Sequence, residues 1–124
     1  MPVVRYIVDD VDACLPFYRA LGFRLVERWG PPFAIVKHRS LTIWLSGPGT
    51  SARKRRRGGA TPEPGGWNRI VIEVKDVDST LQALVAAGAV VRSKPLLGPG
   101  GTQALVEDPS GNPIELFEPR LADA

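Results

Sequence analysis

The chain has 124 residues, of which 44% are hydrophobic and 23% are charged, and its formal net charge is +3. This length is typical of one domain, and the apolar fraction is sufficient for a hydrophobic core. No apolar stretch approaches the roughly 18 residues that span a bilayer, and the first residues lack a signal-peptide pattern. The single cysteine, Cys14, excludes an internal disulfide. We therefore expect a cytoplasmic protein without a membrane partner.

The positive charge is concentrated in one segment, residues 53–57, which reads RKRRR. Without it the remaining basic residues would be slightly outnumbered by the acidic ones, so the rest of the chain is close to neutral. Five adjacent cations could neutralise phosphates, but no aromatic residue is interleaved among them. A solvated loop is favoured, and we expect no nucleic-acid partner.

An internal repeat relates the two halves of the chain. Residues 4–24 align without a gap on residues 70–90, and 7 of the 21 aligned positions are identical. Two independent domains of about 60 residues would each be only marginally stable, so we expect the copies to share one core. A paired module makes a pocket between its copies, and this is where a ligand is expected.

The first copy, residues 1–46, predicts a strand, a helix and three further strands. β-Forming residues alternate at residues 3–8, and aspartates at residues 9–12 then introduce an amphipathic helix that ends at Gly22. Pro/Gly or polar turns separate the remaining strands. We expect these strands at residues 23–28, 33–37 and 41–45.

The second copy, residues 67–119, repeats this order with a strand at residues 69–74 and a helix at residues 77–87. Asp-Pro and Gly-Asn make residues 108–112 a well-specified turn. Gly, Pro and Arg dominate residues 47–66 between the copies, which predicts a flexible loop that is either a lid or a spacer. The last three strands are expected at residues 89–93, 102–107 and 113–117.

Strand alternation predicts which charged side chains point away from the helices. If Val4 and Tyr6 pack on the first helix, Arg5 points to the opposite face of the sheet. By the same rule Arg69 and Glu73 face away from the second helix, and Glu115 occupies the last strand. Such charges on otherwise apolar strands are costly unless they pair or line a wet cavity, so all four are candidate ligand contacts.

The repeated βαβββ order, together with the segments VDDVDACLPFYRALGF and EDPSGNPIELFEP, resembles the vicinal oxygen chelate superfamily of glyoxalases, extradiol dioxygenases and bleomycin-resistance proteins. The resemblance covers the chain apart from the loop at residues 47–66. It implies an α+β fold in which the two modules form a concave, mixed-sheet half-barrel around a ligand. It also implies a homodimer, whose modules pair within one chain or swap between two.

The resemblance places metal ligands at Val3, Trp44, Arg69 and Glu115. Among these only Glu115 can ligate, because arginine stays protonated and repels a cation. A metal site normally needs three or more protein donors. We therefore expect no metal or other cofactor, and an ion pair between Arg69 and Glu115 at the vacated site. The only histidine, His38, is expected in a solvent-facing turn.

The resemblance then favours the metal-free branch, whose members bind or sequester a small molecule. An aromatic or weakly anionic metabolite or antibiotic fits the balance of charges. A lyase, isomerase or dioxygenase that uses Glu115 as base or ligand is the alternative, and the tryptophans could equally fill core and dimer interface. The candidate ligand-binding residues are Arg5, Trp29, Phe33, Trp44, Trp67, Arg69, Glu73 and Glu115.

Overall fold

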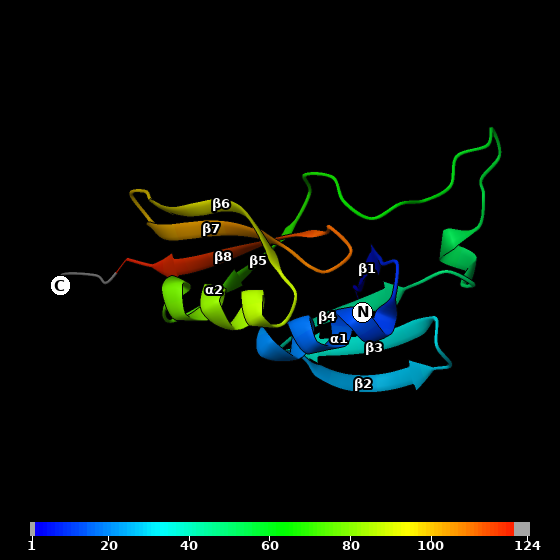
Figure 1. Cartoon of the computed structure of the whole chain (residues 1–124), viewed down its shortest axis with the longest axis horizontal. Helices are drawn as coiled ribbons and strands as arrows, with labels where there is room; N and C mark the ends of the chain where they lie inside the picture. The colour runs from blue at the N-terminus through cyan, green and yellow to red at the C-terminus, as the bar shows by residue number, and fades with distance from the viewer. Residues whose placement is uncertain (1, 121–124) are drawn as a thin grey trace.

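The computed structural model describes residues 2–120, which form two modules of like architecture (Figure 1). The connection between the modules carries a short 3-10 helix, η1 (Ser51–Arg53). The first module consists of β1 (Val4–Ile7), α1 (Val11–Ala20), β2 (Arg24–Trp29), β3 (Phe33–His38) and β4 (Leu41–Ser46). The second consists of β5 (Ile70–Glu73), α2 (Val77–Ala86), β6 (Val90–Leu97), β7 (Gly101–Glu107) and β8 (Pro113–Pro119).

Each module contains a four-stranded mixed sheet. The strand orders are β1-β4-β3-β2 and β5-β8-β7-β6, so the first strand of each module pairs in parallel with its last strand. The remaining pairs are antiparallel hairpins. This topology confirms the expected α+β fold of two βαβββ modules.

Equivalent residues of the repeat begin and end the two helices. Asp10 and Asp76 are the N-caps of α1 and α2, and each carboxylate accepts hydrogen bonds from backbone N–H groups of the first turn. Such caps stabilise a helix by about 1 kcal/mol. Gly22 and Gly88 follow the helices with φ of 107° and 101°, a conformation that favours glycine.

The two modules share one hydrophobic core, as expected. Each helix covers one face of its own sheet, and α1 and α2 lie side by side between the sheets (Figure 1). Phe17, Leu84, Ile43 and Ile114 are completely buried and belong to a single cluster that includes both helices and both sheets. Neither α-helix lies on the opposite face of its sheet, which is called the helix-free face below.

The turn at residues 108–112 contacts the first module, a role that the sequence analysis did not assign to it. Asn112 Nδ2 donates to the carbonyl oxygen of Ile7 at 2.7 Å, and the backbone N–H of Asp9 donates to Ser110 Oγ at 2.9 Å. The side chains of Asp108 and Asn112 are almost fully buried. Polar contacts therefore add to the hydrophobic core in joining the modules.

Two expectations about the chain were incomplete. Strand β6 continues to Leu97 rather than ending at residue 93, because an edge strand tolerates Pro95 and the two bulges found there. The loop at residues 47–66 is not structureless, because η1 buries Ala52. Among residues 2–120 no helix is long and apolar enough to cross a membrane.

Candidate functional site

An open pocket of about 500 Å³ lies on the helix-free face of the first sheet. Trp44 and Ile35 are register partners in the centre of the sheet, and Phe33 and Trp29 pair at its end. The rings of Phe33 and Trp44 pack edge to face with their centroids 5.8 Å apart. Most of the surface of this pocket is apolar or aromatic. The residues lining it are Arg5, Glu27, Trp29, Phe33, Ile35, Trp44, Thr50 and Ser51.

Arg5 contributes a positive charge to the lining of this pocket. It is the register partner of Trp44 on the neighbouring strand, and its guanidinium carbon lies 5.0 Å from the centre of the indole ring. One guanidinium nitrogen donates to Ser46 Oγ at 3.0 Å. These two contacts orient the guanidinium at the side of the aromatic surface and leave most of its five N–H donors free for a ligand.

Trp29 forms the exposed wall of the pocket, with 65% of its surface accessible. Its Nε1 donates to Glu27 Oε2 at 2.9 Å, so the carboxylate in this pocket is already hydrogen-bonded to the pocket wall. An exposed indole costs free energy in water, which a bound aromatic molecule would remove. The aromatic wall and floor therefore suit a flat ligand.

Arg69 and Glu115 form the expected ion pair on the helix-free face of the second sheet. Arg69 Nη2 and Nε donate to Glu115 Oε1 at 2.9 and 3.0 Å. The Arg69 side chain is 34% exposed, whereas that of Glu115 is only 14% exposed. The guanidinium therefore neutralises a carboxylate that would otherwise be costly to bury.

Trp67 lies outside the pocket on the first sheet. Its ring stacks under the guanidinium of Arg92 at 4.6 Å, and 70% of its surface is exposed. Arg92 in turn pairs with Glu107 at 2.8 Å and donates to the carbonyl of Gly66. This cluster belongs to the second module and to the end of the connecting loop.

The structure thus divides the eight candidate residues between the two modules. The first sheet brings together Arg5, Trp29, Phe33 and Trp44 in one pocket. The other four belong to the second module, where Glu73 is exposed beside the turn at residues 38–41 of the first module. Sequence alternation could not identify Thr50 and Ser51 as pocket residues, because they lie in the loop.

The residues at the family's metal positions do not suit a metal. Trp44 lies in the aromatic pocket, and the Glu115 carboxylate is held by Arg69. Within residues 2–120 no three histidine, cysteine, aspartate or glutamate side chains are grouped closely enough to hold an ion. A guanidinium at 2.9 Å from the one available carboxylate would repel a divalent cation.

His38 and Cys14 have structural environments. His38 Nδ1 lies 3.2 Å from the carbonyl oxygen of Gly22, and its ring packs against Phe23. Cys14 is fully buried and its Sγ lies 3.3 Å from Ser110 Oγ. Burial, together with the nearby Asp108 carboxylate, raises the pKa of the Cys14 thiol to about 12. The thiol is therefore protonated at neutral pH, as suits a structural residue.

Comparison with protein families matches residues 1–116 to the Glyoxalase/Bleomycin resistance protein/Dioxygenase superfamily. The chain belongs to this superfamily. The match covers both modules up to the middle of β8, so it includes the pocket on the first sheet and the Arg69–Glu115 pair. Superfamily membership defines the fold and leaves the ligand to be argued from this chain's own residues.

Solved structures of several other proteins share the fold. A glyoxalase-related enzyme from Fulvimarina pelagi aligns with a TM-score of 0.80 and 22% identity over 100% of this chain and 94% of that one. Lactoylglutathione lyase from Agrobacterium tumefaciens aligns with a TM-score of 0.69 and 23% identity over 95% and 92% of the two chains. TnmS3, an antibiotic binding protein from Streptomyces sp. CB03234, aligns with a TM-score of 0.65 and 25% identity over 97% of each chain.

Proposed function

We propose that this superfamily member binds or sequesters a small aromatic molecule in the pocket on the first sheet. The observation that carries the proposal is the aromatic surface of Phe33, Trp44 and Trp29 around an open pocket of about 500 Å³. Pockets of about 300 to 1,000 Å³ lined mainly by apolar and aromatic side chains are typical ligand sites. The antibiotic-binding relative TnmS3 supports the same class of function.

The charges in the pocket favour an uncharged or anionic ligand. Glu27 accepts a hydrogen bond from Trp29, whereas Arg5 retains unpaired N–H donors beside the Trp44 ring. A cationic ligand would be repelled by this guanidinium. The best match is therefore an aromatic metabolite or antibiotic that is neutral or carries a negative group.

Catalysis by Glu115 has less support. A general base must lie within hydrogen-bond reach of the proton that it removes. Oε1 of Glu115 already accepts from two nitrogens of Arg69, and this carboxylate lies on the second sheet, whereas the aromatic pocket lies on the first. Binding without turnover is therefore the function that the geometry supports best.

We also propose that the protein forms a homodimer through the helix-free face of the second module. Val71 and Leu96 lie on this face and are 54% and 62% exposed. Exposed apolar residues on one face of a sheet commonly mark protein interfaces. Light scattering should give twice the monomer mass, and a Leu96→Lys variant should shift the protein to the monomer. A monomeric parent protein would contradict this proposal.

Titration calorimetry with 2-naphthamide, a neutral two-ring probe, tests the pocket. The Trp44→Leu variant should bind this probe about 5- to 150-fold more weakly, because base-like rings gain about 1–3 kcal/mol from stacking on one aromatic side chain. Phe117→Leu is the matched control, since this half-buried ring lies on the second sheet. Equal affinities of the parent and the Trp44 variant, or loss of binding in both variants, would contradict the proposal.

A further inference from the structure

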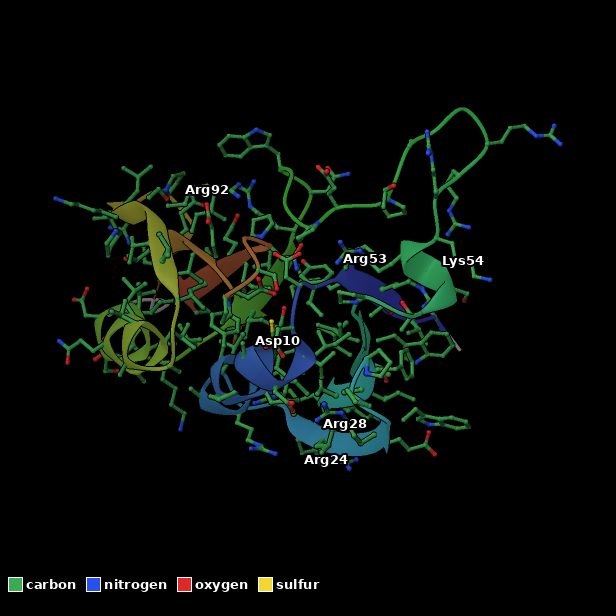
Figure 2. All side chains as sticks on the ribbon, turned by 45° about the vertical axis from the view of Figure 1, so that its right-hand side comes forward. Asp10, Arg24, Arg28, Arg53, Lys54 and Arg92 are labelled. Atoms are coloured by element: carbon green, nitrogen blue, oxygen red, sulfur yellow. The ribbon has the colours of Figure 1, made fainter. Side chains whose placement is uncertain are left out.

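The five adjacent cations of the connecting loop have different environments. Arg53 is anchored, because its Nη1 donates to the carbonyl oxygen of Val8 at 2.7 Å and lies 3.5 Å from the Asp9 carboxylate. Only 17% of its side chain is exposed. Figure 2 shows Arg53 beside the start of the first module, whereas Lys54 lies at the outer end of η1, as its C-cap. Residues 54–57 are exposed.

The Arg53 anchor holds η1 against the first module. Ala52 is buried, and Ser51 and Thr50 reach the edge of the aromatic pocket. Arg56 then folds back over this turn, with Nη2 lying 3.5 and 3.4 Å from the carbonyl oxygens of Ser51 and Ala52. The loop therefore brings one of its cations next to the helix-free face of the first sheet.

A second pocket of about 380 Å³ lies between the loop and strand β1. This second pocket adjoins the aromatic pocket, because Arg5 and Ser51 line both pockets. The residues lining the second pocket are Arg5, Ile7, Ser51, Ala52, Arg56 and Pro62.

The charge of this second pocket is entirely positive. Its lining contains two guanidiniums, from Arg5 and Arg56, and no carboxylate. Among residues 2–120 neither guanidinium forms an ion pair. Two like charges placed on one cavity repel each other unless an anion lies between them. Guanidinium groups also bind carboxylate, sulfonate and phosphate groups through paired N–H donors.

We infer that Arg5 and Arg56 form an anion subsite next to the aromatic pocket, so that the preferred ligand is an aromatic molecule bearing a carboxylate, sulfonate or phosphate. This inference rests on the proposed function, since the ring of the ligand occupies the pocket of Trp44. The anionic group lies under the loop, and Arg5 contacts both parts of the ligand. The loop is then a part of the binding site rather than a spacer.

Paired probes with the same rings test this subsite. Calorimetric titration with 2-naphthoate and with neutral 2-naphthamide separates the contribution of the anion from that of the rings. The parent protein should bind 2-naphthoate about tenfold more tightly, and this advantage should shrink as NaCl rises from about 20 to 500 mM. The Arg56→Gln variant should lose most of the advantage, so that the two probes bind to it with similar affinity.

The Lys54→Gln variant is the matched control, because it removes one exposed cation from the same loop without touching either pocket. It should retain the advantage of 2-naphthoate. Equal binding of both probes, or equal loss in the Lys54 and Arg56 variants, would overturn the anion subsite and leave the aromatic pocket standing.

A titration with inorganic phosphate tests the subsite separately from the rings. If neither naphthalene probe binds, the proposed aromatic site fails. Saturable shifts of the Arg56 Nε–Hε signal with phosphate, absent in the Arg5→Gln variant, would then support the anion subsite alone. The absence of such shifts together with equal binding of the two probes would overturn it.

Discussion

Tyr18 donates a 2.7 Å hydrogen bond to the carboxylate of Asp108, which follows it by 90 residues in the chain. Tyr18 is completely buried in the first module, and Asp108 is 2% exposed at the start of the turn between β7 and β8. The other contacts of Asp108 are with Ser110 and Asn112 of its own turn. This bond therefore joins the two modules through a buried charge.

Removing the phenol hydroxyl should weaken the association of the modules. The Tyr18→Phe variant leaves the buried carboxylate with one donor fewer, which typically costs about 1–3 kcal/mol. Urea denaturation followed by circular dichroism should show this loss of unfolding free energy. Tyr6→Phe provides a comparison at a less buried phenol that also joins the modules, and a smaller loss is expected there because its two hydrogen bonds, with Pro113 and Ile70, are longer at 3.2 Å. An unchanged midpoint for Tyr18→Phe would contradict a stabilising role for this bond.

The stability of the protein should depend on the ionisation of Asp108. Burial raises the pKa of this carboxyl above its usual range, although hydrogen bonds from Tyr18 and Asn112 oppose the change. The folded state then binds the proton more tightly than the unfolded state. The contribution of Asp108 to stability is full below its unfolded pKa and is lost as the pH rises through the raised folded pKa.

Denaturation from pH 3 to pH 8 measures this contribution. The Asp108→Asn variant cannot titrate at this position, so the difference in unfolding free energy between parent and variant should change with pH across that window. We expect Asp108→Asn to be destabilised throughout, because its amide nitrogen is a donor. It would replace either Oδ2, which accepts from Tyr18 and Asn112 Nδ2, or Oδ1, which accepts from backbone N–H groups of the turn. A difference that is independent of pH would contradict the raised pKa.

The Cys14 thiol should be unreactive in the native protein. Its pKa is raised to about 12 by burial, so the thiolate needed for reaction is scarce at pH 8. Ellman's reagent should label less than about a tenth of the protein within minutes, and one thiol per chain after unfolding in guanidinium chloride. Rapid labelling of the native protein would show that the helix and the Ser110 turn separate readily.

Loss of the Arg53 anchor should release the loop. In the Arg53→Gln variant, the carbonyl of Val8 and the carboxylate of Asp9 lose their contact with η1. Trypsin should therefore cut at the remaining basic residues 54–57 several times faster than in the parent, with little change in global stability. Lys54→Gln is the control that removes one cleavage site without the anchor. Equal cleavage rates in the two variants would contradict the anchoring role.

The protein should retain no divalent metal at the Arg69–Glu115 site. Elemental analysis after equilibration with zinc, iron, manganese and nickel should give well below one ion per chain, and these ions should not raise the melting temperature. The Arg69→Ala variant removes the competing guanidinium and tests whether Glu115 alone is sufficient. Stoichiometric metal in the parent would redirect the search toward lyase and dioxygenase chemistry.

The repeated elements of the fold could be predicted from the sequence because their signals are local. The capping aspartates, the glycines after the helices and the alternation of the strands depend on neighbouring residues only. The ion pair between Arg69 and Glu115 could be predicted because the family resemblance places both residues at neighbouring metal-ligand positions. The extension of β6 past Pro95 was missed, because a proline does not reveal whether its strand lies at an edge.

The loop part of the site could not be predicted in the same way. The conformation of η1 depends on Arg53 meeting the carbonyl of Val8, a contact between residues far apart in sequence. In the sequence alone, where that contact cannot be seen, the five cations of residues 53–57 are indistinguishable. The same limitation applies to residues 108–112, whose turn geometry is local whereas their docking on the first module is not.

The chain could be cut at Gly58, at the tip of the connecting loop, without disturbing the contacts between the modules. Nothing lies within 4 Å of the position that a side chain at Gly58 would occupy, and neither pocket includes this residue. A cut here would leave the buried bonds between the modules intact and remove only the covalent tether. The two fragments should then reassemble more completely at higher protein concentration. In the intact chain the loop keeps the two modules close together and so gives them a high effective concentration.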